Sequence, residues 1–273
     1  TDALTIDSVG RSAELVDFHD EHDAERAMKW RPSYEAVIHG TDDEVRQIRS
    51  LIDEEFADVF DFESSHVGAI TERTGVWHYI DTGDARPVAK APYRMSPKER
   101  ELTDKWIDDM LRTGAVSPAP AGTEWAAPCL WVPKPGGGQR FYQDYRGLNS
   151  VTKKDKTRPP EIVDIIDKMA HCDRFSKMDW CASFNQIAIY PPHRQKTGFI
   201  THRGLFISNV LGFGPTNGPA TLQATANVIM GDALIKTHSQ YIDDGICHTK
   251  GGFDEHFAAL RNGFLKLRAG GVK

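Results

Sequence analysis

Residues 239–245 read SQYIDDG, in which an aromatic residue precedes two adjacent carboxylates, Asp243 and Asp244, and a glycine typical of a turn. A third carboxylate, Asp179, lies 64 residues before Asp243 in a predicted strand over 175–180. Two magnesium ions about 3.5–4 Å apart need acidic ligands from separate strands, because each ion also holds phosphate oxygens. Three close carboxylates would repel one another without bound cations. The pattern therefore predicts a two-cation site, although Asp-Asp before Gly is also an ordinary turn composition.

Composition limits the classes of protein that fit. The 273 residues are 40% apolar, which is enough for one large domain or two small ones. There is no run of about 18 apolar residues and no secretory signal, so we expect an intracellular protein without a membrane span. The chain begins at Thr1, and we expect it to be a piece of a longer product. Its cysteines form no CxxC pair, which predicts reduced thiols at Cys129, Cys172, Cys181 and Cys247.

Charge divides the chain into two regions. Residues 1–85 hold 7 Lys and Arg against 21 Asp and Glu, whereas residues 86–273 hold 26 against 18. A basic body suits a protein that follows phosphate backbones, and a uniformly acidic surface would oppose such binding. We therefore predict a separate acidic extension over 1–85 that is solvated and partly helical. The alternative is a nucleic-acid mimic or a docking arm that occupies the basic cleft of residues 86–273.

Apolar periodicity predicts the main elements. Ser96 is typical of a helix N-cap and Pro97 of a first helical position. The patterns predict helices over 42–60, 97–112, 161–169 and 221–235, and strands over 127–133, 140–145, 175–180, 183–189 and 206–210.

Two loops are candidates for binding phosphate. The glycine-rich tip 134–139 lies between Lys134 and Arg140, so its amides and cationic side chains could meet the oxygens of a nucleoside triphosphate. The turn 212–220 leads into a helix and exposes backbone that could seat a phosphate or a base pair. The competing interpretations are an ordinary surface hairpin and a capped loop.

The order of these pieces resembles the reverse transcriptase region of the Pol polyprotein of gypsy-class long-terminal-repeat retrotransposons. Residues 1 to about 50 carry no part of the resemblance. The motifs that carry it are, in chain order, FADVF (56–60), RP (86–87), PYRMSP (92–97), RF (140–141), DYRGLN (144–149), FSKMD (175–179), QI (186–187), KTGF (196–199), FGPTNGPATLQ (213–223) and YIDD (241–244). The resemblance implies an α+β fold: the fingers and palm of a right-hand polymerase, with an antiparallel palm sheet backed by helices and an acidic helical N-terminal extension.

The resemblance also implies a role for individual residues. Two Mg²⁺ ions, or Mn²⁺ in their place, would be held by Asp179, Asp243 and Asp244. The substrates would be a deoxynucleoside triphosphate and a primer on an RNA or DNA template. The nucleotide would be bound by Lys134, Arg140, the backbone carbonyl of Trp180, Phe213 and Gly214, with Phe184 as a steric gate against the ribose 2′-hydroxyl. Gln223 would lie on the template side.

Several departures from the family pattern oppose full activity. Residues 237–240, THSQ, are polar where the family has an apolar strand, and Gly245 replaces an aliphatic residue. The chain stops at Lys273, near the predicted end of the palm, so we expect no thumb or ribonuclease H and weak activity. Two functions stay open: an RNA-directed DNA polymerase fragment, or a catalytically silent structural or binding subunit whose partners are other proteins.

Overall fold

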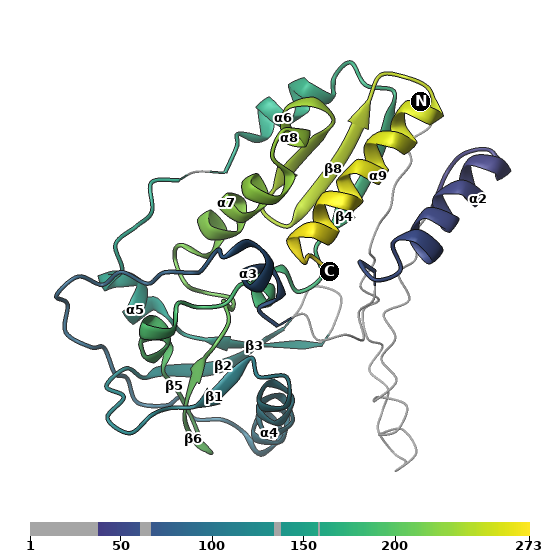
Figure 1. Ribbon diagram of the computed structural model, residues 1–273. Helices are drawn as coiled ribbons and strands as arrows, with labels where there is room; N and C mark the ends of the chain where they lie inside the picture. Colours follow the sequence, from purple (N-terminus) through teal and green to yellow (C-terminus); the bar gives the residue numbers. More distant parts are fainter. Residues whose placement is uncertain (1–37, 61–66, 134–137, 158) are drawn as a thin grey trace, which may run out of the picture.

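Two separate sheets organise the protein (Figure 1). The computed structural model describes residues 38–60, 67–133, 138–157 and 159–273. The larger sheet has the strand order β1-β6-β5-β2-β3, and the smaller sheet has the order β4-β8-β7. The strands are β1 (Val116–Pro118), β2 (Ala127–Pro133), β3 (Gln139–Gln143), β4 (Arg174–Asp179), β5 (Phe199–Thr201), β6 (Gly204–Ser208), β7 (His238–Tyr241) and β8 (Asp244–Thr249).

Helices cover one face of the smaller sheet, where α9 lies in front of β8 and β4 in Figure 1. Buried side chains of α7, α9, β4 and β8 share one apolar core, whereas the larger sheet and α4 share a second. The α-helices are α2 (Asp42–Ser50), α3 (Ala69–Thr74), α4 (Pro97–Arg112), α5 (Arg146–Val151), α6 (Ile162–Met169), α7 (Gly218–Met230), α8 (Ala233–Lys236) and α9 (Phe253–Gly270). The short helical segments are η1 (Leu51–Glu55), a π-helix, and the 3₁₀-helices η2 (Ser183–Gln186) and η3 (Pro191–Thr197).

The described part of the acidic segment belongs to the smaller sheet's core. Thr41 caps α2 in a capping box with Glu44. Three acidic residues in the first turn also stabilise α2, because negative charge is favourable at a helix N-terminus. The apolar side of α2 and η1 packs against α9, and Phe56 meets Phe264 edge to face with ring centroids 5.3 Å apart. Arg268 of α9 donates to Asp58 over 2.9 Å and stacks on Phe56. Residues 42–55 are therefore helical, as α2 and η1, whereas the predicted helix over 56–60 is wrong because these residues form bends and turns. Both parts pack into the core of the smaller sheet.

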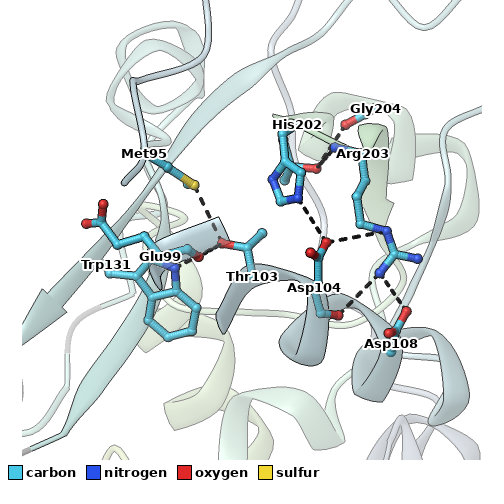
Figure 2. A network of polar contacts seen from close by, with 10 residues as sticks. Met95, Glu99, Thr103, Asp104, Asp108, Trp131, His202, Arg203 and Gly204 are labelled. Carbon is cyan, nitrogen blue, oxygen red and sulfur yellow. Dashed lines mark hydrogen bonds and ion pairs between the residues drawn. The ribbon is translucent and has the colours of Figure 1, made fainter. Parts of the chain in front are cut away.

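A polar network ties α4 to the turn between β5 and β6 (Figure 2). Asp104 accepts from His202 over 2.9 Å, and Arg203 reaches Asp108 over 2.6 Å. The fully buried Thr103 donates to the Glu99 carbonyl and accepts from the Trp131 indole over 3.0 Å. As predicted, Ser96 caps α4 and Pro97 begins it. This network fixes the position of the β2–β3 hairpin because Trp131 lies on β2.

Two further predicted elements differ from the structure. The prediction of a strand over 183–189 is wrong, because Ser183–Gln186 form η2 after a left-handed Ala182 with φ 44°, and Ala188 and Ile189 make only isolated β-bridges. The Gln186 amide donates to the Lys273 carbonyl over 3.1 Å, a long-range bond that local alternation does not reveal. The helix over 221–235 is divided at Gly231, where φ is 51°, into α7 and α8.

Among the described residues, no helix combines the length and the apolar character needed to cross a bilayer.

Candidate catalytic site

The smaller sheet brings the three predicted carboxylates together along the backbone. Asp179 ends β4 and Asp244 begins β8, and the two are direct partners in the antiparallel register. Side chains of such partners lie on the same face, with Cβ atoms about 4.5–5.5 Å apart. Asp243 lies in the turn just before Asp244, and its carbonyl accepts from the Trp180 amide over 3.2 Å. The Asp179 side chain is exposed, and those of Asp243 and Asp244 are half-buried.

The side chains of these acids have not closed around one point. Within the described residues, no group of three or more His, Cys, Asp or Glu side chains is arranged to hold a metal ion. Asp244 instead faces Lys177, with 3.4 Å between Nζ and Oδ1. Lys177 lies two residues before Asp179 on β4 and therefore on the same face of the sheet. The ammonium group of Lys177 thus offsets part of the repulsion between the carboxylates of Asp179 and Asp244, which are opposite each other on two strands.

The donor chemistry still fits divalent cations. Carboxylate oxygens are the ligands that Mg²⁺ prefers, and each of these acids has a side chain that solvent reaches. Burial raises the pKa of the neighbouring Cys181 thiol, and the negative charge of Asp179 is a second, smaller cause in the same direction. That the three acids hold metal remains a prediction, supported by the strand register.

Two glutamines hold the turn that carries Asp243. Gln223 of α7 is buried, and its Oε1 accepts from the Ile242 amide over 3.0 Å. Its Nε2 donates to the carbonyl of Gln240 over 3.3 Å. Gln240 in turn donates from Nε2 to the Ile242 carbonyl over 3.1 Å. The template-side role of Gln223 stays a prediction, whereas the structure shows its amide bonded to the hairpin.

The polar strand before Tyr241 forms despite its composition. The expectation that residues 237–240 make a poor buried strand is wrong: β7 pairs along β8, and His238, Ser239 and Gln240 are all buried. Most of their polar groups have partners, since Thr237 contacts His238 Nδ1 over 2.9 Å and Ser239 contacts His248 over 3.1 Å. The other ring nitrogen, His238 Nε2, is buried without a hydrogen-bond partner among the described residues. Buried polar groups are tolerated when they are hydrogen-bonded.

The glycine after the carboxylates has a specific packing reason. Gly245 is the register partner of Gln240, and a Cβ on it would lie 2.8 Å from Gln240 Oε1. β8 pairs with β4 on one side and β7 on the other, and the weakening of this strand by Gly245 stays a prediction. The glycine makes room for a polar neighbour.

Three of the predicted nucleotide-binding residues, Arg140, Phe213 and Phe184, lie together between the larger sheet and η2. Arg140 of β3 lies over the Phe213 ring, with its guanidinium carbon 4.6 Å from the centroid. Phe213 is 42% exposed and meets Phe184 of η2 edge to face, with centroids 5.5 Å apart. Tyr142 of β3 lies 6.1 Å from Phe213 on another side. A cation and aromatic rings therefore meet at a partly open surface between the larger sheet and η2.

The turn around Gly214 is held in a defined conformation. Gly214 has φ 111°, and a Cβ on it would lie 3.3 Å from the Tyr145 ring, so a glycine suits both the angle and the space. Asn149 of α5 donates to the Gly214 carbonyl over 2.8 Å and accepts from the Thr216 amide over 2.9 Å. Trp180 is buried, which leaves its backbone as the predicted contact. Lys134 lies outside the described residues.

Sequence reasoning missed two residues of this site. Lys177 had a usable signal, because a residue two positions before Asp179 on a strand shares its face. Gln240 had none, since its contact with Ile242 depends on the conformation of the turn. A hollow of about 660 Å³ lies elsewhere, and none of the three carboxylates lines it: it is formed by Arg46, Gln47, Ser50, Leu51, Glu54, Glu55 and Phe257.

Comparisons with known proteins agree with this geometry. The sequence is 27% identical over 209 residues to the Retrovirus-related Pol polyprotein from transposon 297 of Drosophila melanogaster, and the match covers 75% of this chain and 20% of the relative. Transposon Tf2-3 polyprotein of Schizosaccharomyces pombe is 27% identical over 176 residues, covering 64% of this chain and 13% of the relative. The chain thus spans about a fifth or less of the length of these polyproteins. The gypsy class remains a prediction.

Solved structures share the fold. Prototype foamy virus protease-reverse transcriptase superposes with a TM-score of 0.74 at 24% identity, over 85% of this chain and 30% of the viral chain. The foamy viral enzyme in complex with an RNA/DNA hybrid gives a TM-score of 0.71 at 23% identity, over 84% and 30%. The reverse transcriptase (RNA-dependent DNA polymerase) family matches residues 132–273, more than half of the 273 residues. The strand-paired carboxylates, the fingers-and-palm fold and this match together mean that the chain belongs to the reverse transcriptase family.

Proposed function

We propose that this chain carries the nucleotidyl-transfer site of an RNA-directed DNA polymerase. The observation that carries the proposal is the register of β4 and β8, which places Asp179 directly opposite Asp244 with Asp243 in the adjoining turn. Among the described residues, α7 and α9 share the core on the other face of the sheet, and Lys177 and Asp179 are exposed on this face. A primer end and a triphosphate could therefore reach the carboxylates.

Asp179, Asp243 and Asp244 are the residues that would hold divalent cations. Bound Mg²⁺ would supply a lowered pKa for the attacking 3′-hydroxyl and neutralise the charge of the triphosphate. The chain itself supplies placement: Trp180 and Asp243 join the two acidic strands through a backbone hydrogen bond of 3.2 Å. Lys177 faces Asp244, and its ammonium group would place a positive charge beside the phosphates of a bound nucleotide.

Arg140, Phe213 and Phe184 are the proposed nucleotide contacts. The guanidinium of Arg140 can bind phosphate oxygens in a bidentate fashion, and its stacking on Phe213 limits the directions it can take. The edge of Phe184 packs against Phe213, so Phe184 has a fixed orientation from which to exclude a 2′-hydroxyl. The partners of this site would be a primer on an RNA or DNA template, held mainly through phosphates with salt-sensitive affinity.

Single-nucleotide extension of a labelled primer on an RNA template tests the proposal. The chain of residues 1–273 is compared with Asp243→Asn and with the matched control Asp254→Asn, which makes the same change of charge in an exposed acid of α9. We expect Mg²⁺-dependent extension that falls at least about 100-fold in Asp243→Asn and is kept in Asp254→Asn. Equal extension by the chain and Asp243→Asn, or none by the chain, would reject the polymerase and favour the structural subunit.

A further inference from the structure

The residue before the two carboxylates has a strained backbone. Ile242 has φ 58°, in the left-handed region, and it is one of two described non-glycine residues with positive φ. A β-branched residue is a genuine outlier there, because its Cβ crowds the neighbouring carbonyl. Such strain persists only where the surrounding structure compensates for it. The question is which contacts keep Ile242 in this conformation.

Both polar groups of the Ile242 backbone are held by glutamine side chains. The N–H donates to Gln223 Oε1 over 3.0 Å, and the carbonyl accepts from Gln240 Nε2 over 3.1 Å. The backbone fixes which end of each amide faces it, since an N–H requires an oxygen and a carbonyl requires an NH₂. Gln223 also donates to the Gln240 carbonyl over 3.3 Å, so the two side chains act on the same turn.

We propose that Gln223 and Gln240 form a clamp that keeps Ile242 left-handed and thereby directs Asp243 toward Asp179 and Asp244. They are positioning residues, because neither contacts the reacting groups. Gly245 is matched to this clamp: a Cβ on it would lie 2.8 Å from Oε1 of its register partner Gln240, so the amide of Gln240 would have to shift. The polar strand and the glycine, each a departure from the family pattern, are then one matched pair. The effect on catalysis rests on the proposed function, whereas the clamp rests on geometry alone.

Amide hydrogen exchange tests the clamp without any turnover. Gln223→Met removes both of its bonds to the turn and a third bond to Asn227, whereas Gln223→Glu keeps an acceptor for the Ile242 N–H and loses the donor. We expect slow exchange of the Ile242 amide in the unchanged chain, fast exchange in Gln223→Met and slow exchange in Gln223→Glu. Thr103→Val is the control, because it breaks buried hydrogen bonds in the remote network of Figure 2 and should leave Ile242 unchanged. Equal exchange in the unchanged chain and Gln223→Met would overturn the clamp.

Kinetics and Mn²⁺ binding test what the clamp does. In Gln223→Met and Gln240→Met we expect kcat to fall by about 10- to 100-fold with KM for the nucleotide within about twofold, because misplaced catalytic groups act on the chemical step. Mn²⁺ should bind more weakly, measured by paramagnetic resonance without nucleic acid. Fast Ile242 exchange with unchanged kcat would overturn the positioning role. No turnover by the unchanged chain, together with exchange that follows the predicted pattern, would support the clamp and reject the proposed function.

A double-mutant cycle tests the matched pair. Gly245→Ala alone should reduce Mn²⁺ affinity and loosen Ile242, because its methyl group displaces the Gln240 amide. In a Gln240→Ala background the same change should have little further effect, since the clashing atom is gone. Additive losses in the double variant would overturn the pairing of Gly245 with Gln240.

Discussion

Opposed carboxylates define this protein at the scale of single residues. Asp179 and Asp244 lie directly across two strands, an arrangement that costs free energy unless a positive charge offsets it. Lys177 supplies such a charge, at 3.4 Å from Asp244, with both side chains about half exposed. The pair is therefore a weak, solvent-screened interaction that cations can displace.

Lys177→Met should strengthen Mn²⁺ binding by the chain alone. Removing the ammonium frees Asp244 from a competing partner, and a half-exposed pair is worth about 0.2–1 kcal/mol, which corresponds to at most about a fivefold change in affinity. Titration followed by paramagnetic resonance measures it, with Lys266→Met, which loses a salt bridge on α9, as the control. Weaker binding in Lys177→Met would contradict this assignment.

Gly263→Ala should destabilise the fold although alanine favours helices. Gly263 lies on α9 directly against the buried His238, and a Cβ there would overlap the His238 ring. Overpacking costs about 1–3 kcal/mol and outweighs the roughly 1 kcal/mol gained in helix propensity. Urea unfolding should show a lower midpoint for Gly263→Ala than for its exposed neighbour changed as Asn262→Ala. An equal midpoint would mean that α9 can move away from β7.

At the scale of elements, part of the acidic segment belongs to the apolar core. The described residues 42–60 carry acidic side chains outward and bury Ile48, Leu51, Ile52 and Phe56 against α9. The charge balance groups residues 1–85 as one extension, and the boundary at residue 85 stays a prediction. The packing shows that α2 and η1 stabilise the helix that backs the carboxylate sheet.

Phe56→Ala should therefore lower the stability of the whole palm. Phe56 is fully buried and packs on Phe264 and under Arg268, so the change leaves a cavity that costs about 3–5 kcal/mol. The measurement is the free energy of unfolding followed by near-ultraviolet circular dichroism. Gln47→Ala, an exposed change on α2, is the control. A palm that unfolds at the same denaturant concentration in Phe56→Ala would identify 42–60 as an independent module.

At the scale of the whole molecule, three buried histidines are neutral. Burial is the main cause that lowers the pKa of His78, His238 and His256 to about 4 each. Their hydrogen-bond partners are hydroxyl groups: Thr221 for His78, Thr237 for His238, and Ser176 and Thr249 for His256. No carboxylate among these partners can compensate a positive charge. The bonds of His256 join α9 to β4 and β8, and the bond of His78 reaches α7.

Stability should fall as pH drops from about 6.5 to about 4. The unfolded chain takes up protons at these histidines near pH 6.5, whereas the folded chain resists them until about pH 4, so acid favours unfolding across this window. Each histidine contributes roughly 3 kcal/mol at most. Below about pH 4, Asp58 and Asp144, whose pKa values are lowered by hydrogen bonds from Arg268 and Arg146, add to the loss.

Urea midpoints measured between pH 7.5 and 4.5 check this expectation. His78→Gln should flatten the pH dependence by removing one group, and His171→Gln, an exposed histidine, is the control. Midpoints that stay level across the range would show that the histidines take up protons without unfolding.

Local sequence determined much of this protein. The caps at Ser96 and Pro97, the apolar side of residues 42–55 and the strand 127–133 form as their patterns predict, because capping and amphipathic burial depend on neighbours in the chain. The family motifs also predicted that Arg140, Phe184 and Phe213 belong to one site. The Asp-Asp pair was visible as a turn beside a strand.

Tertiary structure alone decided how that site is held. The bonds from Gln223 and Gln240 to Ile242, the room that Gly245 leaves and the charge of Lys177 beside Asp244 all arise between segments whose register no local pattern reveals. A polar strand that looks unsuited to burial becomes suitable once a facing glycine and hydrogen-bonding partners surround it. The sequence by itself determined which side chains could bind cations and nucleotides. The packing of α7 and α9 on the sheet decided the geometry of those side chains. The physical reason is that the buried amides of Gln223 and Gln240 can hold the turn only when their hydrogen-bond partners are in place.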